Sequence, residues 1–364
     1  SSPDMLLGWD SDPALRNIAG LAAKFPDLAK RGIRLRQFGQ EICGRITGKK
    51  IHAMGIVPGG ILFPLKAEDR KDLLAWIPEV TKTTEMAIEI IKGYMQEHEK
   101  EIDGFAHFET GHMGTVGPNG EHELYDGRIR LIDSHGKVLQ DQFDPLNYLD
   151  IIAERPLAWS YLKAPYYKPM GFPNGSYRVG PLARLNVATK MKTPGAQKEF
   201  EIFKKMRPAP INGSFYFHYA RLIEVLACIE EIHQILDDES ILSTETLATA
   251  PRNQERGVGC TEAPRGILFH DYRVDKDGKI LKANLLIATG QNNLAMNRSV
   301  LEVAKQVVRK GAASEGALNR IEGAIRCYDP CLSCSTHALG QMPIQLEILD
   351  AQGNLLQRLA RSSG

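Results

Sequence analysis

The sequence lacks several features that would place it in a specialised class of protein. It contains no uninterrupted apolar run of the roughly 18 to 20 residues that a membrane-spanning helix requires, so we expect no membrane span. Its 45 lysines and arginines nearly balance its 44 aspartates and glutamates, and the net charge of +1 indicates no nucleic-acid partner. Six cysteines in 364 residues are too few to hold a disulfide-stapled scaffold.

The composition that is present is that of a globular protein, with 43% hydrophobic and 24% charged residues. Three of the cysteines, Cys327, Cys331 and Cys334, lie close together near the end of the chain. This spacing favours a reducing compartment and a thiolate site over disulfides. The chain opens with Ser1-Ser2-Pro3-Asp4 and shows no basic and apolar leader, so we expect no targeting segment there.

Most of the expected elements are helices. Apolar residues recur at helical spacing after Ser11-Asp12-Pro13, between Phe25 and Gly48, over 73–101 and, most regularly, over 222–236. Two more helices are expected near the end, one capped by Asn297 and one capped by Ser314.

Three segments alternate with a period of two and predict β-hairpins: 128–139, 267–287 and 344–356. The stretch 156–194 is rich in proline, glycine and tyrosine and predicts ordered but irregular chain. No repeat or flexible linker is evident. We therefore predict an α+β fold, a predominantly helical large domain with a bundle of long helices and peripheral β-hairpins.

The sharpest chemical motif is Asp329-Pro-Cys331-Leu-Ser-Cys334-Ser-Thr-His337. Two thiols three residues apart can converge on one soft metal ion, and an imidazole three residues further on can hold a second ion. Half of a zinc knuckle, a redox disulfide and two unpartnered thiols are alternatives. Because no second Cys-x-x-Cys is present, the remaining ligands would be other cysteines or would lie outside this chain.

A second motif, Glu262-Ala263-Pro264-Arg265-Gly266, precedes an apolar strand. Proline restricts the backbone, so Arg265 would project from a fixed place and could clamp an anion. A surface arginine beside Glu262 is the alternative. The glycines between Gly48 and Gly60 fit no phosphate loop, and helix-ending glycines are the simpler interpretation.

Taken together, these motifs resemble the large subunit of nickel–iron hydrogenases. The segment 329–337 resembles the C-terminal metal motif of that family, 262–266 its arginine motif, and 48–60 its central Gly/His motif. Ala288-Thr289-Gly290-Gln291-Asn292 fits as well. The resemblance covers essentially the whole chain and is greatest to the cytoplasmic, bidirectional NAD-reducing type.

The resemblance implies a set of metal ligands. Nickel would be held by four cysteinates, two of which match Cys331 and Cys334. Cys334 would also bridge to an iron that carries CO and CN ligands. His337 would bind magnesium together with the backbone carbonyl of Leu285.

The resemblance also implies roles around the metals. Arg265 would lie over them as a catalytic group, held by Asp329 and Asp4, while Ala263, Pro264 and Thr289 would line the pocket of the diatomic ligands. Electrons would leave through a small iron–sulfur subunit towards diaphorase subunits that bind flavin and NAD, in the cytoplasm.

The chain departs from the family pattern at both ends, and we expect a fragment at the first and an unprocessed precursor at the second. The N-terminal Cys-x-x-Cys motif is absent, as in a chain that begins after it. Residues 1–337 would form the catalytic domain, and residues 338–364 a maturation extension that an endopeptidase removes between His337 and Ala338.

Two other functions remain open at this point. One is a metal-free scaffold subunit related to respiratory complex I, against which Cys331, Cys334 and His337 argue. The other is an unrelated structural zinc-binding protein, in which the arginine motif would be a coincidence.

Overall fold

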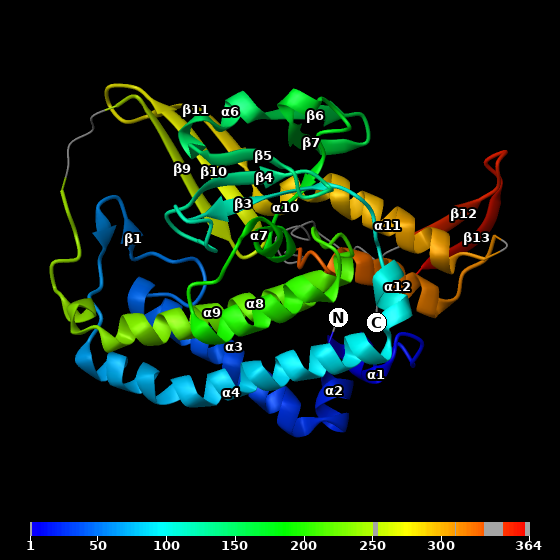
Figure 1. Cartoon of the computed structure of the whole chain (residues 1–364), viewed down its shortest axis with the longest axis horizontal. Helices are drawn as coiled ribbons and strands as arrows, with labels where there is room; N and C mark the ends of the chain where they lie inside the picture. Colours follow the sequence, from blue (N-terminus) through cyan, green and yellow to red (C-terminus); the bar gives the residue numbers. More distant parts are fainter. Residues whose placement is uncertain (1, 250–253, 310, 331–344, 361–364) are drawn as a thin grey trace.

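A layer of long helices forms one side of the molecule in the computed structural model, which describes residues 2–249, 254–309, 311–330 and 345–360. The three longest helices are α3 (Pro26–Thr47), α4 (Ala67–Glu97) and α9 (Phe217–Asp237), and α4 packs against both of the others (Figure 1). Ile77, Ile88 and Ile91 belong to the buried stripe of α4, whose spacing of three, four, seven and eleven residues fits an amphipathic helix.

Two sheets form the other side. The four-stranded sheet has the order β5-β4-β3-β8, in which only β3 and β8 run parallel. The three-stranded antiparallel sheet has the order β11-β10-β9. Their strands are β3 (Gly111–Val116), β4 (Arg128–Ile132), β5 (Val138–Phe143), β8 (Tyr177–Arg178), β9 (Arg256–Ala263), β10 (Gly266–Val274) and β11 (Ile280–Leu286).

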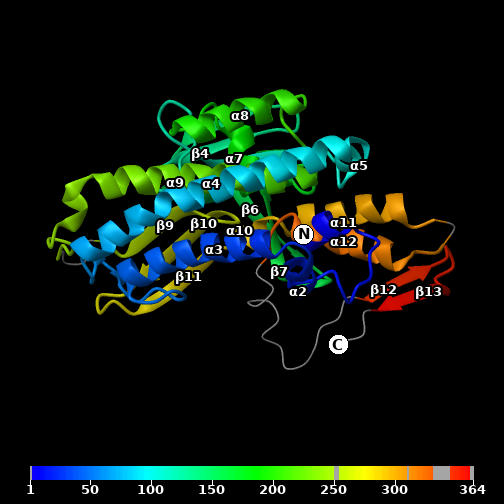
Figure 2. The same ribbon diagram turned by 90° about the horizontal axis from the view of Figure 1, so that it is seen from below.

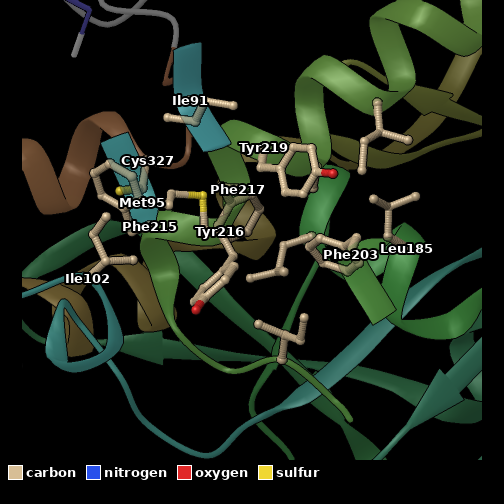
Figure 3. Packing of buried hydrophobic residues seen from close by; sticks show 14 of the residues in the cluster. Ile91, Met95, Ile102, Leu185, Phe203, Phe215, Tyr216, Phe217, Tyr219 and Cys327 are labelled. Atoms are coloured by element: carbon tan, nitrogen blue, oxygen red, sulfur yellow. The ribbon is translucent and has the colours of Figure 1, made fainter. Parts of the chain in front are cut away.

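The helix α7 (Pro181–Val187) lies between the two layers, where it contacts β3 on one side and α9 on the other (Figure 1). All seven of its residues are buried. The largest apolar core joins α4, α7, α8 and α9, and Figure 3 shows Met95 near Phe217 and Leu185 near Phe203 within it. A second core joins the two sheets through residues such as Met113, Ile129, Ile267 and Phe269.

The shorter elements complete the chain, and Figure 2 shows the helices α11 and α12 beside the hairpin β12–β13. They are α1 (Ser2–Leu7), α2 (Ile18–Lys24), β1 (Ile56–Val57), β2 (Gly60–Ile61), α5 (Glu99–Gly104), α6 (Tyr148–Ile151), β6 (Ile152–Leu157), β7 (Ser160–Tyr167), α8 (Pro194–Met206), α10 (Ala288–Gln291), α11 (Asn293–Val307), α12 (Glu315–Arg326), β12 (Gln345–Leu349) and β13 (Leu355–Ala360). Among the described helices, none combines the length and apolarity needed to cross a bilayer.

The predicted α+β class is confirmed, as are the three hairpins and the helices at α3, α9 and α12. Ser314 caps α12 as expected, since its hydroxyl accepts from the amide of Ala317 at 3.1 Å. The sheets are larger than the predicted peripheral hairpins. The strand β3 extends the pair β4–β5, and β9 extends the pair β10–β11.

Three local predictions were wrong. The helix expected after Ser11-Asp12-Pro13 is α2 and begins only at Ile18, because the side chain of Asn17 accepts from the amides of Ala19 and Gly20 and caps it. The helix expected to start after Asn297 begins at Asn293. The stretch 156–194 is not irregular, because it contains β7, β8 and α7. Pairing with β6 forms β7, and burial favours the regular backbone of β8 and α7.

Candidate metal centre

Arg265 projects from a tight turn between β9 and β10. Ala263 and Gly266 are paired across this turn, which leaves Pro264 and Arg265 as its two central residues. Proline at the first central position and glycine after the second are favoured in a type I turn. Gly266 has a φ of +136°, and a Cβ there would lie 2.3 Å from the side chain of Val179, so only glycine fits.

The side chain of Arg265 contacts Asp329. Nη2 lies 3.3 Å from Oδ2 of Asp329, and Nε donates to its backbone carbonyl. Asp329 follows the end of α12 and has a φ of +51°, a left-handed conformation that aspartate tolerates better than most residues. The structure therefore brings the arginine motif and the start of the cysteine motif together, while the catalytic roles of both residues stay predictions.

Asp4 lies on α1 and is 5% exposed. Its carboxylate is 3.3 Å from Nη2 of Arg326, the last residue of α12. Asp4 thus forms an ion pair with Arg326, and its predicted support of Arg265 stays a prediction.

Asp329 also lines a cavity of about 800 Å³ between α1, α2, α3, α4 and α9. Most of its lining is apolar, with Leu21, Ile91 and Val225 among the side chains. Its polar lining includes Asp329, Arg326, Arg221 and His218. An apolar cavity with a few converging polar groups is the usual form of a ligand or cofactor site.

Cys327 stands two residues before Asp329 but belongs to the core. It is 1% exposed, its sulfur lies 3.7 Å from Nε2 of His218, and Figure 3 shows it packed near Met95 and Phe215. Burial raises the pKa of its thiol to about 12 and holds the pKa of His218 well below its usual value. A protonated thiol and a neutral imidazole pack well but make no thiolate ligand.

Cys331, Cys334, His337 and Ala338 lie outside the described residues, so their predicted roles as ligands and as the processing site have no structural description. Within the described ranges, no group of three or more histidines, cysteines and carboxylates is placed to hold a metal ion.

The Ala288–Asn292 segment lies against the arginine turn. Nδ2 of Asn292 is 3.4 Å from the backbone carbonyl of Arg265, and Oδ1 of the same side chain accepts from the amide of Val179 at 2.9 Å. Thr289 is on the short helix α10, which contacts β10. Leu285 pairs with His270 in the β10–β11 ladder, and its side chain is 41% exposed.

The Gly/His segment, residues 48–60, contacts the chain at Leu247 and Ala248. Gly60 pairs with Leu247, and a Cβ at Gly59 would lie 2.0 Å from the carbonyl oxygen of Ala248. His52 is exposed. These glycines therefore allow a close approach of two backbone segments, which agrees with a structural role.

Behind the arginine turn lies a cluster of buried charged residues, Arg184, Glu224, Glu262 and His122, which we call the buried charge cluster. Arg184 donates to both carboxylate oxygens of Glu224 at 2.6 Å and to Glu262 at 2.8 Å. His122 contacts Glu224 at 2.8 Å. Glu262 also accepts from the amide of Thr115 at 2.9 Å. The alternative interpretation of the arginine motif, a surface arginine beside Glu262, does not describe Glu262, which is buried and paired with Arg184.

The pKa values of the two carboxylates of the buried charge cluster shift in opposite directions. Burial raises the pKa of Glu262, and the nearby Arg184 does not fully offset it. Burial also opposes ionisation of Glu224, but the charge and two hydrogen bonds of Arg184 outweigh it and lower that pKa to about 2.

The sequence analysis did not predict this cluster, although the sequence contains a signal for it. Arg184 is the one charged residue of Pro181–Val187, whose other residues are apolar except for one asparagine. Glu224 follows Ile223 on the buried side of α9. Charged residues on an apolar face are rarely buried unless they are paired.

Comparison with known proteins gives consistent matches. The family model of nickel-dependent hydrogenases matches residues 100–337. The HoxS subunit beta of the NAD-reducing hydrogenase of Cupriavidus necator is 40% identical over 99% of this chain and 75% of its own length. The matching chain of the F420-non-reducing hydrogenase vhc of Methanococcus voltae is 40% identical over 98% of this chain and 76% of its own length.

Solved structures give the same match. The crystal structure of an NAD+-reducing [NiFe]-hydrogenase in the H2-reduced state aligns with a TM-score of 0.89 and 41% identity, over 93% of this chain and 75% of that one. A [NiFeSe]-hydrogenase of Dm. baculatum aligns with a TM-score of 0.67 over 92% of this chain and 73% of that one. Its identity is 19%, so this second likeness concerns the fold alone.

Proposed function

The chain belongs to the nickel-dependent hydrogenase family, and from this premise we propose that it is the catalytic subunit of an enzyme that interconverts dihydrogen with protons and electrons and delivers the electrons to NAD. The observation that carries the proposal is the contact between Arg265 and Asp329. It joins the arginine turn to the residue that stands two places before Cys331 in the sequence.

We propose that Arg265 borders a metal group as a fixed cation. Cys331 and Cys334 would supply two soft thiolates to nickel and iron, and CO and CN would complete the iron. A bound nickel–iron group supplies the Lewis acidity that polarises dihydrogen, which no side chain offers. His337 and the carbonyl of Leu285 would hold magnesium.

The contribution of the protein is orientation and charge. The guanidinium of Arg265 keeps its planar face in one direction, because Nε and Nη2 both contact Asp329. A preorganised cation of this kind stabilises negative charge that develops beside it without further reorganisation. Ala263, Pro264 and Thr289 would shape the pocket of the diatomic ligands from the turn and from α10.

The electrons need a route to NAD, and the four cysteines other than Cys331 and Cys334 are too scattered in this sequence to form an iron–sulfur motif. We propose that its partners are diaphorase subunits with flavin and NAD and a small iron–sulfur subunit. A cytoplasmic location follows from the use of NAD. Residues 1–337 would form the catalytic domain, and an endopeptidase would remove residues 338–364 after His337.

The test is hydrogen-dependent NAD reduction by the complex purified with its partner subunits, measured together with its metal content. We expect nickel, iron and turnover in the unsubstituted complex, and infrared bands of bound CO and CN. Cys334→Ser should lose nickel, iron and turnover. Cys43→Ser, which replaces an exposed cysteine on α3, should keep all three. Zinc in place of nickel in the unsubstituted complex would contradict the proposal.

A further inference from the structure

Arg184 contacts the arginine turn directly as well as the buried carboxylates. Its Nη1 donates to the carbonyl of Ala263 at 3.0 Å, and its Nη2 donates to the carbonyl of Pro264 at 3.2 Å. These are the two residues that immediately precede Arg265. The side chain of Arg184 is 2% exposed and comes from α7, between the sheet layer and the helical layer.

Three successive carbonyls of the turn are therefore held by side chains from other elements. Arg184 on α7 holds those of Ala263 and Pro264, and Asn292 contacts that of Arg265 at 3.4 Å. A turn with its carbonyls bonded in this way has few alternative backbone conformations, so the direction in which Arg265 leaves it is fixed.

The carboxylates in turn fix Arg184. Glu224 binds Nε and Nη2 of the guanidinium, and Glu262 binds Nη1. Planar, bidentate pairing of this kind gives geometric specificity that a lysine cannot reproduce. Buried ion pairs contribute little net stability compared with well-packed apolar residues, so an effect on position is the better explanation of this arrangement.

We propose that Arg184 is a positioning residue for Arg265. By binding the carbonyls of Ala263 and Pro264, it holds the turn at a fixed position relative to the buried helix α7. The consequence for hydrogen turnover rests on the function proposed above, whereas the consequence for the order of the turn does not. A displacement of about 1 Å at a catalytic group can lower a rate on the order of a hundredfold, so the position of this turn matters for activity.

The first measurement uses the unsubstituted complex and compares the two turns at the ends of β10. Hydrogen exchange of residues 262–267 should be at least about tenfold slower than exchange around 275–278, because bonds to α7 oppose opening of the first turn, whereas the amides of the second turn are bonded within their own hairpin. Equal exchange in the two turns would overturn the proposal without any variant.

The second measurement compares Arg184→Lys with Arg130→Lys. Arg130 is a matched control, since it also binds a carboxylate with two nitrogens, at 2.8 and 3.1 Å from Asp141, and a carbonyl, at 3.1 Å from Val187. In Arg184→Lys we expect exchange of residues 262–267 to become faster, and kcat for hydrogen to fall about tenfold or more at unchanged nickel content. Arg130→Lys should show neither change.

A third variant separates position from stability. Ile88→Val shortens a side chain of the helical core but leaves Arg184, its carboxylates and its two carbonyl contacts in place, so the complex should lose thermal stability while its kcat stays within about twofold of the unsubstituted value. If Arg184→Lys exchanged and turned over like Arg130→Lys, Arg184 would have no positioning role. Absence of turnover in the unsubstituted complex would contradict the proposed function, and the exchange comparisons would still decide the role of Arg184.

Discussion

Arg265 presents one planar guanidinium to two different oxygens of Asp329, the backbone carbonyl and a carboxylate oxygen. A lysine at this place would keep the charge but could not span both oxygens in one plane. The side chain of Arg265 is 30% exposed, so the contact with Asp329 contributes through orientation more than through the stability of the fold.

We predict that Arg265→Lys lowers hydrogen turnover on the order of a hundredfold or more while the nickel content stays nearly constant, because a preorganised donor is lost and the chain still folds. The measurement is the kcat of the purified complex together with metal analysis. Arg273→Lys, at an exposed position of β10, is the control. Normal turnover in Arg265→Lys would show that the arginine has no part in catalysis.

One helix positions Asp329 and another positions Arg184. The helix α12 delivers Asp329 just beyond its C-terminal end, and its N-terminus is fixed by the hydroxyl of Ser314. The helix α7 delivers Arg184, and its complete burial leaves that side chain no route to solvent.

Ser314→Ala should lower the free energy of unfolding by about 1 kcal/mol, because the hydroxyl that satisfies a free amide of the first turn of α12 is removed. Urea unfolding of the chain measures this change. Ser314→Asp keeps an acceptor oxygen at the cap and should be close to the unsubstituted protein. A full-sized loss in Ser314→Asp would show that the effect does not come from capping.

Across the molecule, the metal site depends on the packing of the two layers. Ile267 and Phe269, just after the arginine turn, belong to the core that joins the two sheets. The helical core on the other side includes Leu185 of α7 and Cys327, which precedes Asp329. Arg265 and Asp329 therefore meet where two separately packed cores approach each other.

Acid should destabilise this packing through His112, which is buried in β3 between Asn186 and Asn212. Burial and the nearby Arg178 lower its pKa to about 3. Between roughly pH 6.5 and 3 the unfolded chain binds a proton there and the folded chain does not, so the free energy of unfolding falls as the pH is lowered.

The measurement is urea unfolding as a function of pH. One such proton corresponds to a slope of at most about 1.4 kcal/mol per pH unit, and His112→Gln should remove that contribution from the profile. His107→Gln, at an exposed position, should leave the profile unchanged. An identical slope in His112→Gln would exclude His112 as its source.

Features that depend on neighbours along the chain could be predicted before the fold was known. The periodic apolar residues of α9 predicted that helix, Ser314 predicted the start of α12, and Ala263-Pro264-Arg265-Gly266 predicted a fixed arginine ahead of a strand. The cysteine motif, the arginine motif, the Gly/His motif and the segment 288–292, in that family's order, indicated the family. Each of these depends on backbone preferences or on residues a few positions apart, which a sequence displays directly.

The partners of the charged groups, in contrast, became visible only in the folded molecule. Arg184 pairs with Glu224 and Glu262, which are 40 and 78 residues away in the sequence, and Asp4 pairs with Arg326 near the other end of the chain. The prolines and glycines of 156–194 indicated irregular chain, yet pairing with β6 formed β7 and burial between two layers imposed α7. Burial and ion pairing depend on distances in space, and an arginine within an apolar segment does not reveal from its neighbours which carboxylate will compensate its charge.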